Sequence, residues 1–197
     1  MKKEQIYNIF SRIPTLETER LLLRAMKISD AEDMYSYARR TDVTEYLLWS
    51  PHQSFFYTKD YLQYIESRYS VGDFYDWAVV EKSSNRMIGT CGFTSIDLSN
   101  GCGEIGYVLN PIFHGKGYAT EAAEKVLDFG FNTLELHRIE VRFMEKNLAS
   151  RRVAEKLGMV FEGWKREAIF SKGKHQTVGV CAILCSEYNN KEYNNGK

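Results

Sequence analysis

The sequence predicts one domain of mixed α and β structure. The chain has 197 residues, and domains contain about 150 residues on average, so one domain with a sizeable core is expected. Apolar residues recur with a period of two in some segments and 3.6 in others, which indicates strands alternating with helices. The content of 44% hydrophobic and 14% aromatic residues excludes a disordered chain, which would bury too little apolar surface to offset its ordering entropy.

Each element follows from its local pattern. In chain order we expect a strand over 19–26, helices over 29–40 and 58–69, strands over 74–82, 87–96 and 104–109, a helix over 119–134, a strand over 138–143, a helix over 149–157, and strands over 160–161 and 177–184. Ser29 and Glu32 have the spacing of a capping box at a helix start, and Gly158 is a typical C-terminal stop. A hairpin turn at 83–85 joins the first two strands of an antiparallel meander.

The ends of the chain set the expected boundaries. We expect a folded domain over 14–187, a helical or extended segment over 1–13, and a disordered polar tail over 188–197. Neither a signal-peptide pattern nor an apolar run of about 18 residues occurs, which predicts a cytoplasmic protein without membrane association.

Charge and metal-ligating residues exclude several partners. With 26 basic and 26 acidic residues, the chain offers no net field that would attract nucleic acid. Four cysteines without C-x-x-C spacing predict reduced thiols, and with the four histidines they show no metal-ligand spacing. We therefore expect no metal.

The segment 110–122 places Gly115 and Gly117 between a strand and a periodic helix. Free backbone N–H groups and the positive end of the helix dipole meet there, which favours phosphate binding, and Lys116 adds a charge. The alternative is a tight turn that needs positive φ. The Walker pattern fails because Lys116 precedes Gly117 rather than a hydroxyl residue. The G-x-G-x-x-G match at 101–106 precedes a strand instead of a helix, so we interpret it as chance.

The stretch His114-Gly-Lys-Gly-Tyr-Ala119 resembles the Q/R-x-x-G-x-G/A signature of the GNAT superfamily of acetyl-CoA-dependent N-acetyltransferases. Three further segments, 16–24, 103–109 and 147–163, are similar to the branch that contains the ribosomal-protein N-terminal acetyltransferases. The four motifs occur in the right order and extend the resemblance over about residues 14–187.

This resemblance implies a three-layer α+β fold, with helices on both faces of a mostly antiparallel sheet that is splayed between its fourth and fifth strands. Acetyl-CoA would enter the split, and no metal is implied. Its pantetheine would pair with the fourth strand at Tyr107, Val108 and Leu109. The pyrophosphate would lie against a loop and helix start made of His114, Gly115, Lys116, Gly117, Tyr118, Ala119 and Thr120. Asn147 and Ser150 would contact the pantetheine arm and the thioester sulfur, or else simply cap their helix.

The chemistry of amine acetylation assigns three catalytic positions. An amine attacks a thioester only when neutral, so a base must remove a proton, and Glu104 at the start of the fourth strand is the candidate. Its alternative role is pairing with a Lys or Arg across the sheet. A backbone amide near Val108 would stabilise the oxyanion. Ala154 occupies the position of the usual Tyr acid, which leaves Ser150, another Tyr or no side chain to protonate the thiolate.

Other positions depart from the family pattern. His114 replaces Gln or Arg, and Thr177 stands where this branch often has Asp. Ile169 stands where the N-terminal-alanine acetyltransferases have a Glu base, so Glu104 or Glu167 is left as the base. Trp49 and His52 lie in a loop that borders the acceptor entrance in this branch, and they either bind the substrate with Glu104 or pack in the core.

We therefore expect an acetyl-CoA-dependent N-acetyltransferase whose acceptor amine attacks directly in a ternary complex. The acceptor is a protein N-terminus, possibly ribosomal, or a small-molecule amine, and the protein is a monomer or homodimer. One alternative is a non-catalytic acyl-CoA-binding or sensing domain. A second is a nucleotide-binding protein that uses the glycines at 101–106.

Overall fold

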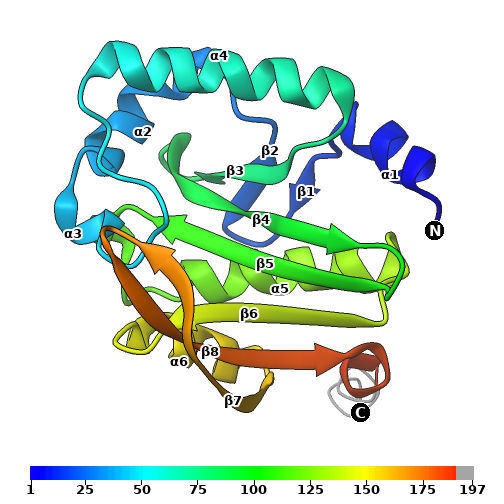
Figure 1. The fold of residues 1–197 in the computed structure, drawn as a ribbon. Helices are drawn as coiled ribbons and strands as arrows, with labels where there is room; N and C mark the ends of the chain where they lie inside the picture. The colour runs from blue at the N-terminus through cyan, green and yellow to red at the C-terminus, as the bar shows by residue number, and fades with distance from the viewer. Residues whose placement is uncertain (190–197) are drawn as a thin grey trace.

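The computed structural model describes residues 1–189 and shows an eight-stranded sheet with helices on both faces (Figure 1). The strands are β1 (Leu16–Glu17), β2 (Leu21–Arg24), β3 (Tyr75–Glu81), β4 (Arg86–Asp97), β5 (Cys102–Leu109), β6 (Arg138–Met144), β7 (Val160–Ser171) and β8 (Lys174–Leu184). The helices are α1 (Lys3–Phe10), α2 (Ala31–Ala38), α3 (Thr41–Thr44), α4 (Phe55–Val71), α5 (Tyr118–Asn132) and α6 (Leu148–Lys156), with short 3₁₀ turns η1 (Ile28–Asp30) and η2 (Pro111–Phe113).

The strands are arranged in the order β1-β2-β3-β4-β5-β6-β8-β7. Neighbouring strands are antiparallel except β5 and β6, which are parallel. The expected meander of β3, β4 and β5 is present, and the predicted mixed, mostly antiparallel α+β fold is confirmed.

Two apolar cores form because successive side chains of a strand point to opposite faces of the sheet. Trp77 and Val79 of β3 pack in one core with α1 and α5. Ala78 and Val80, their neighbours, pack in the other core with α2 and α4. The centre of the sheet is thus covered on both faces. A polar side chain of β3 on either face therefore contacts protein or a cavity rather than bulk water.

The predicted helices and strands are present, and apart from one strand their ends lie within three residues of the expected positions. That strand is β7, which continues from the expected pair 160–161 to Ser171 and forms a long hairpin with β8. The short strand β1 was not predicted.

The capping box expected at Ser29 is wrong. Asp30 lies at the start of α2, and its carboxylate instead accepts the Lys27 N–H at 2.8 Å and pairs with Arg24 at 2.7 Å. A buried carboxylate is better stabilised by a guanidinium than by one backbone amide, so the charged pair determines where the helix begins.

The chain is ordered slightly beyond the expected boundary at residue 187. Residues 185–189 form a helical turn, and the Tyr188 ring lies buried with its centroid 5.0 Å from that of Phe131. The tail prediction is therefore wrong for Tyr188 and Asn189, and its remainder, 190–197, lies outside the described residues. Across residues 1–189, none of the helices has the length and apolar character to cross a bilayer.

Candidate active site

The sheet opens between β5 and β6. Their parallel pairing covers Cys102 to Glu104 of β5, opposite Arg138 to Glu140 of β6, and then stops. Residues 105–109 continue to pair with β4 but have no partner on β6 among the described residues. Backbone groups along this edge are free to bond to an extended ligand, as an added strand would. The expected split between the fourth and fifth strands of the predicted order is therefore confirmed.

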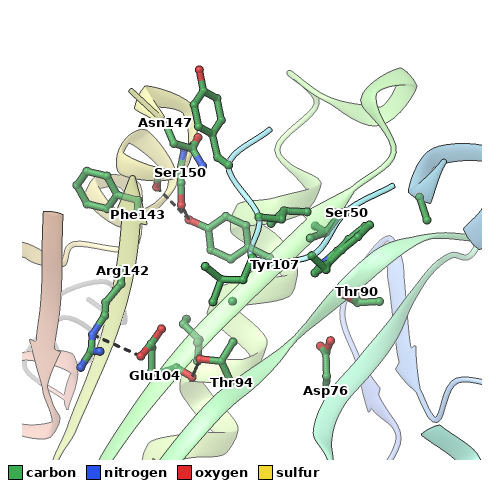
Figure 2. Close-up of a pocket in the computed structure, with 18 of the residues that line it drawn as sticks. Ser50, Asp76, Thr90, Thr94, Glu104, Tyr107, Arg142, Phe143, Asn147 and Ser150 are labelled. Carbon is green, nitrogen blue, oxygen red and sulfur yellow. Dashed lines mark hydrogen bonds and ion pairs between the residues drawn. The ribbon is translucent and has the colours of Figure 1, made fainter. Parts of the chain in front are cut away.

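A cavity of about 640 Å³ opens at this split (Figure 2). Its walls come from α2, the loop over residues 46–53, α4, strands β3 to β8 and the start of α6. Residues predicted for catalysis, substrate and cofactor meet there, namely Trp49, His52, Glu104, Tyr107, Val108, Asn147 and Ser150. Segments more than 90 residues apart in the sequence thus form one chamber.

Glu104 lies where β5 and β6 begin to diverge. Burial raises the pKa of its carboxyl, and the positive charge of Arg142 partly opposes this shift. The Arg142 Nε lies 3.4 Å from Glu104, whereas it donates to Glu140 at 2.8 Å. Glu104 thus has the ion-pair partner that was considered as its alternative role, but Arg142 interacts more closely with Glu140. Its carboxylate also lines the cavity, so both roles are compatible with the structure.

Tyr107, Asn147 and Ser150 form a hydrogen-bonded group on the wall of the cavity (Figure 2). Asn147 Oδ1 accepts the Ser150 N–H at 3.1 Å, so Asn147 is the N-cap of α6, as in the simpler interpretation. The Tyr107 hydroxyl donates to the Ser150 carbonyl at 2.9 Å and lies 3.0 Å from Ser150 Oγ. Burial raises the pKa of Tyr107, so its hydroxyl keeps its proton at neutral pH. The sequence left the identity of a tyrosine donor open, and Tyr107 is the one that reaches Ser150.

The glycines of the loop before α5 have the positive φ angles expected of a tight turn. Gly115 has a φ of 75° and Gly117 a φ of 84°, values that side chains disfavour. A Cβ added to Gly115 would meet no atom within 4 Å, so the space above this turn is open to a ligand. Gly117 is the N-cap of α5, whose first N–H groups are available to an anion.

Arg20 fixes this loop from outside, which the sequence did not reveal. Its guanidinium donates to the Lys116 carbonyl at 3.0 Å, pairs with Glu121 at 2.6 Å and stacks 4.4 Å from the Tyr118 ring centre. These three contacts hold the loop and the first turn of α5 together.

Some residues predicted to contact the cofactor cannot do so through their side chains. Leu109 is buried in the core, and the buried Tyr118 ring donates its hydroxyl hydrogen to Glu81. Because these side chains fill the core, only their backbones remain for a ligand. His114 Nε2 lies 3.0 Å from the Leu109 carbonyl, which ties the loop to the end of β5. Residues 114–120 do not line the cavity described above.

Trp49 and His52 both line the cavity and pack against aromatic neighbours. His52 is 8% exposed, and its Nδ1 lies 2.9 Å from Thr58 Oγ1. Burial lowers the pKa of His52, so the ring is neutral at physiological pH. The structure therefore shows the packing role, and it places both side chains on the cavity wall, where substrate binding stays a prediction.

The second base candidate, Glu167, does not fit the site. Its side chain is exposed, and it does not line the cavity, whereas Ile169 does. Thr177 Oγ1 accepts the Glu167 N–H at 3.3 Å, which is a local contact of the β7–β8 hairpin. Glu104 is therefore the better-placed of the two carboxylates.

Asp76 is a functional candidate that sequence reasoning missed. It lies on β3, is half-buried and lines the cavity beside Thr90 (Figure 2). Burial raises its pKa to about 7, although the Trp77 N–H, which donates to it at 3.0 Å, favours the ionised form. The available signal was a charged residue within the apolar run of a central strand, where charges are rare unless they have a role.

Other features considered earlier carry no chemistry. The G-x-G-x-x-G match falls in the turn before β5 and in β5 itself, so it does not open a helix and the nucleotide-binding alternative is wrong. All four cysteines are free thiols, and none lines the cavity. Within residues 1–189, no group of three or more His, Cys, Asp or Glu side chains is arranged to hold a metal ion.

Comparison with known proteins agrees with this geometry. A family model described as an acetyltransferase (GNAT) domain matches residues 20–160. The N-acetyltransferase p20 of Bacillus licheniformis is 36% identical over 174 residues, covering 88% of this chain and 98% of its own. A spermidine N(1)-acetyltransferase of Vibrio cholerae is 27% identical, covering 87% of this chain and 96% of its own.

Solved structures show the same architecture. A GNAT-family acetyltransferase from Bacillus anthracis superposes with a TM-score of 0.79 at 29% identity, covering 88% of this chain and all of the other. A ribosomal-protein-S5-alanine acetyltransferase from Vibrio fischeri superposes with a TM-score of 0.74 at 25% identity, covering 89% and 98%. The expected likeness to the branch with ribosomal-protein acetyltransferases is confirmed.

Proposed function

Because this chain belongs to the GNAT acetyltransferase family and is an N-acetyltransferase, we propose that it acetylates a primary amine by direct attack within the cavity at the β5–β6 split. The observation that carries this proposal is the convergence of Glu104, Tyr107 and Ser150 on that cavity. Names among the similar proteins include a small amine, spermidine, and a ribosomal protein, so both acceptor classes enter the test.

The donor site is built from backbone. Acetyl-CoA, the family's acetyl donor, supplies an activated thioester. The open space above Gly115 and the free N–H groups at the start of α5 fit its pyrophosphate. The unpaired edge of β5 over residues 105–109 fits the amide groups of its pantetheine arm. Gly115, Lys116 and Gly117 would thus hold one end of the donor and β5 the other.

The acceptor amine must lose a proton before it attacks. Glu104, whose pKa is raised by burial, is a stronger base than an exposed carboxylate and takes that proton directly or through water. A backbone N–H near Val108, on the open edge of β5, stabilises the developing oxyanion. The Tyr107 and Ser150 hydroxyls, which are bonded to each other, supply a proton to the leaving sulfur.

A covalent acetyl-enzyme is not part of this proposal. Cys91 and Cys181 are buried, and burial raises the pKa of both thiols, which keeps them protonated and poorly nucleophilic. None of the four cysteines lines the cavity, so no thiol of the chain lies where an acetyl group would pass.

The experiment is a measurement of amine-dependent CoA release. Purified protein is mixed with acetyl-CoA and, in turn, with small mono- and diamines and with peptides that carry a free N-terminus. Free thiol is followed by absorbance, and the acetylated product is identified by mass spectrometry. We expect release above the amine-free rate for one acceptor class. Binding of acetyl-CoA without release for any acceptor would refute the proposal.

A further inference from the structure

Asp76 presents a half-buried carboxylate to the cavity, without an ion-pair partner among the described residues. Its carboxylate accepts the Trp77 N–H at 3.0 Å and lies near the Thr90 hydroxyl. Within residues 1–189 no Lys, Arg or His side chain forms an ion pair with it. A charged group in a low-dielectric site is costly unless it is paired. A counter-charge from a ligand would remove this cost.

A flat strip of sheet connects Asp76 to the open edge of β5. Asp76 pairs with Gly92 of β4, and Gly92 pairs with Gly106 of β5, so these three residues form one row on the same face. We call this row the glycine floor. A Cβ on Gly92 would lie 2.8 Å from Asp76 Oδ1, so only glycine leaves the carboxylate clear. Because neighbouring strands are about 4.8 Å apart, Asp76 lies on the order of 10 Å from the β5 edge.

The walls around this end of the cavity suit a cation. Aromatic side chains that line it are Tyr37, Tyr46, Trp49, Tyr57, Tyr61, Phe74 and Tyr75. Their π faces attract positive charge. Asp73 lines the same end, but its Oδ2 is already paired with Arg68 at 2.5 Å, so Asp76 is the carboxylate available to a cation there; only the buried Asp73 Oδ1 has no hydrogen-bond partner in the described part of the chain. Arg142, the guanidinium of the lining, is bonded to Glu140 and lies beside Glu104 on the far side of the split.

We propose that Asp76 is a specificity-determining residue that binds a second cationic group of the acceptor while the reacting amine lies at the β5 edge. This inference rests on the proposed acetyl transfer. Asp76 lies on the order of 10 Å from the β5 edge, and its side chain reaches about 3 Å along the floor, which leaves about 7 Å between the carboxylate and that edge. The reacting nitrogen and the remote nitrogen of the acceptor are therefore about 6 to 8 Å apart, the span of roughly four or five methylenes. Acceptors with a neutral or negative group at the remote end lose this contact.

The test compares acceptors of one length with different remote groups. Wild-type kcat/KM is measured at about pH 8.5 for 1,4-diaminobutane, 1-aminobutane, 4-aminobutan-1-ol and 4-aminobutyrate. We expect the diamine to exceed the monoamine by about tenfold or more and the aminobutyrate to fall below it, since one desolvated charge contact changes affinity by this order. Equal values for the diamine and the monoamine would overturn the inference and leave the transferase proposal intact.

The variant Asp76→Asn keeps the shape and removes the charge. We expect the ratio of kcat/KM for the diamine to kcat/KM for the monoamine to fall about tenfold, to near one. Asp128→Asn is the matched control, because it also removes one negative charge but lies on α5 outside the cavity and should keep the preference. A preference that survives in Asp76→Asn would overturn the inference.

Binding separates failure of the inference from failure of the proposed function. Calorimetry measures diamine and monoamine binding to wild type and Asp76→Asn in the presence of CoA, without turnover. Tighter binding of the diamine that depends on Asp76 supports the inference even if no acceptor is acetylated, whereas equal binding of the two amines refutes it. If Asp76→Asn does not fold, Asp76→Ser is used, and failing both, the wild-type order of the four acceptors decides.

Discussion

Replacing Asp76 by Asn should make the protein more stable at alkaline pH and not at acidic pH. Burial raises the pKa of Asp76 from 3.8 to about 7. The folded state therefore holds this proton more tightly than the unfolded state. The contribution of Asp76 to folding stability falls as pH rises from about 4 to above 7. A difference of about three pKa units corresponds to at most about 4 kcal/mol, at 1.36 kcal/mol per unit. Asn removes the charge but still accepts the Trp77 N–H.

The assay is urea unfolding followed by tryptophan fluorescence at about pH 4.5 and pH 8.5. We expect the free energy of unfolding of Asp76→Asn to exceed that of wild type by about 2 to 4 kcal/mol at the higher pH and to match it within about 1 kcal/mol at the lower. Asp97→Asn is a control of opposite sign. Hydrogen bonds from Ser99 and Asn100 lower the pKa of Asp97 to about 2, so its replacement should reduce stability at the higher pH.

Two results would refute this reasoning. If Asp76→Asn is no more stable than wild type at about pH 8.5, the carboxylate is not destabilised by burial. If its advantage is the same at both pH values, the gain comes from packing and not from charge. A variant that is more stable but loses the preference for diamines would show that this carboxylate is retained for function at the expense of stability.

Three further outcomes are expected. Gly115→Trp should abolish the thermal shift caused by acetyl-CoA, whereas the control Gly173→Trp should keep it. Both glycines have positive φ and open space around them, so the backbone strain is matched and only the ligand site differs. Equal loss of the shift in both variants would refute a phosphate site at the loop. Tyr107→Phe should lower kcat by about ten- to 100-fold, because it removes a proton donor. The Kd for acetyl-CoA, measured by calorimetry, should stay within about threefold, because no binding surface is lost. A change in Kd without a change in kcat would contradict the role of Tyr107 as proton donor. Glu104→Gln should lower kcat/KM by about 100-fold near pH 7. In wild type, at constant free-amine concentration, the rate should rise with pH as Glu104 loses its proton, and burial raises the pKa of this group. A variant whose rate still rises with pH in the same way would exclude Glu104 as the base.

The fold was predictable because its signals are local. The apolar stripe of α5, the alternation in β6 and the stop at Gly158 each depend on neighbouring residues, and the structure has all three. The extent of β7 was not predictable, because eight of its residues from 160 to 171 are exposed and lack an alternating apolar pattern. Its pairing with β8 comes from backbone bonds that leave no mark on side-chain type.

The candidate site divides in the same way. The turn at residues 115–117, where we propose that phosphate binds, could be predicted because glycine is the usual residue at positive φ, and Gly115 and Gly117 have such values. The contact between Tyr107 and Ser150 spans 43 residues, and it depends on how α6 docks against β5, which no local pattern encodes. Asp76 was missed for a related reason, since its importance arises from the cavity that other segments build around it.

The glycine floor restricts how acceptor choice can change during evolution. A Cβ on Gly92 would lie 2.3 Å from the Asp76 Cα and from the Tyr75 carbonyl, both backbone atoms that cannot move aside without separating β3 from β4. Gly92 therefore cannot gain a side chain to reshape the cavity for a new acceptor. The loop over residues 46–53 has no such restriction, because loops tolerate substitution and insertion. Divergence of substrate range from this scaffold should be concentrated in that wall and at Asp76, while Gly92 is retained.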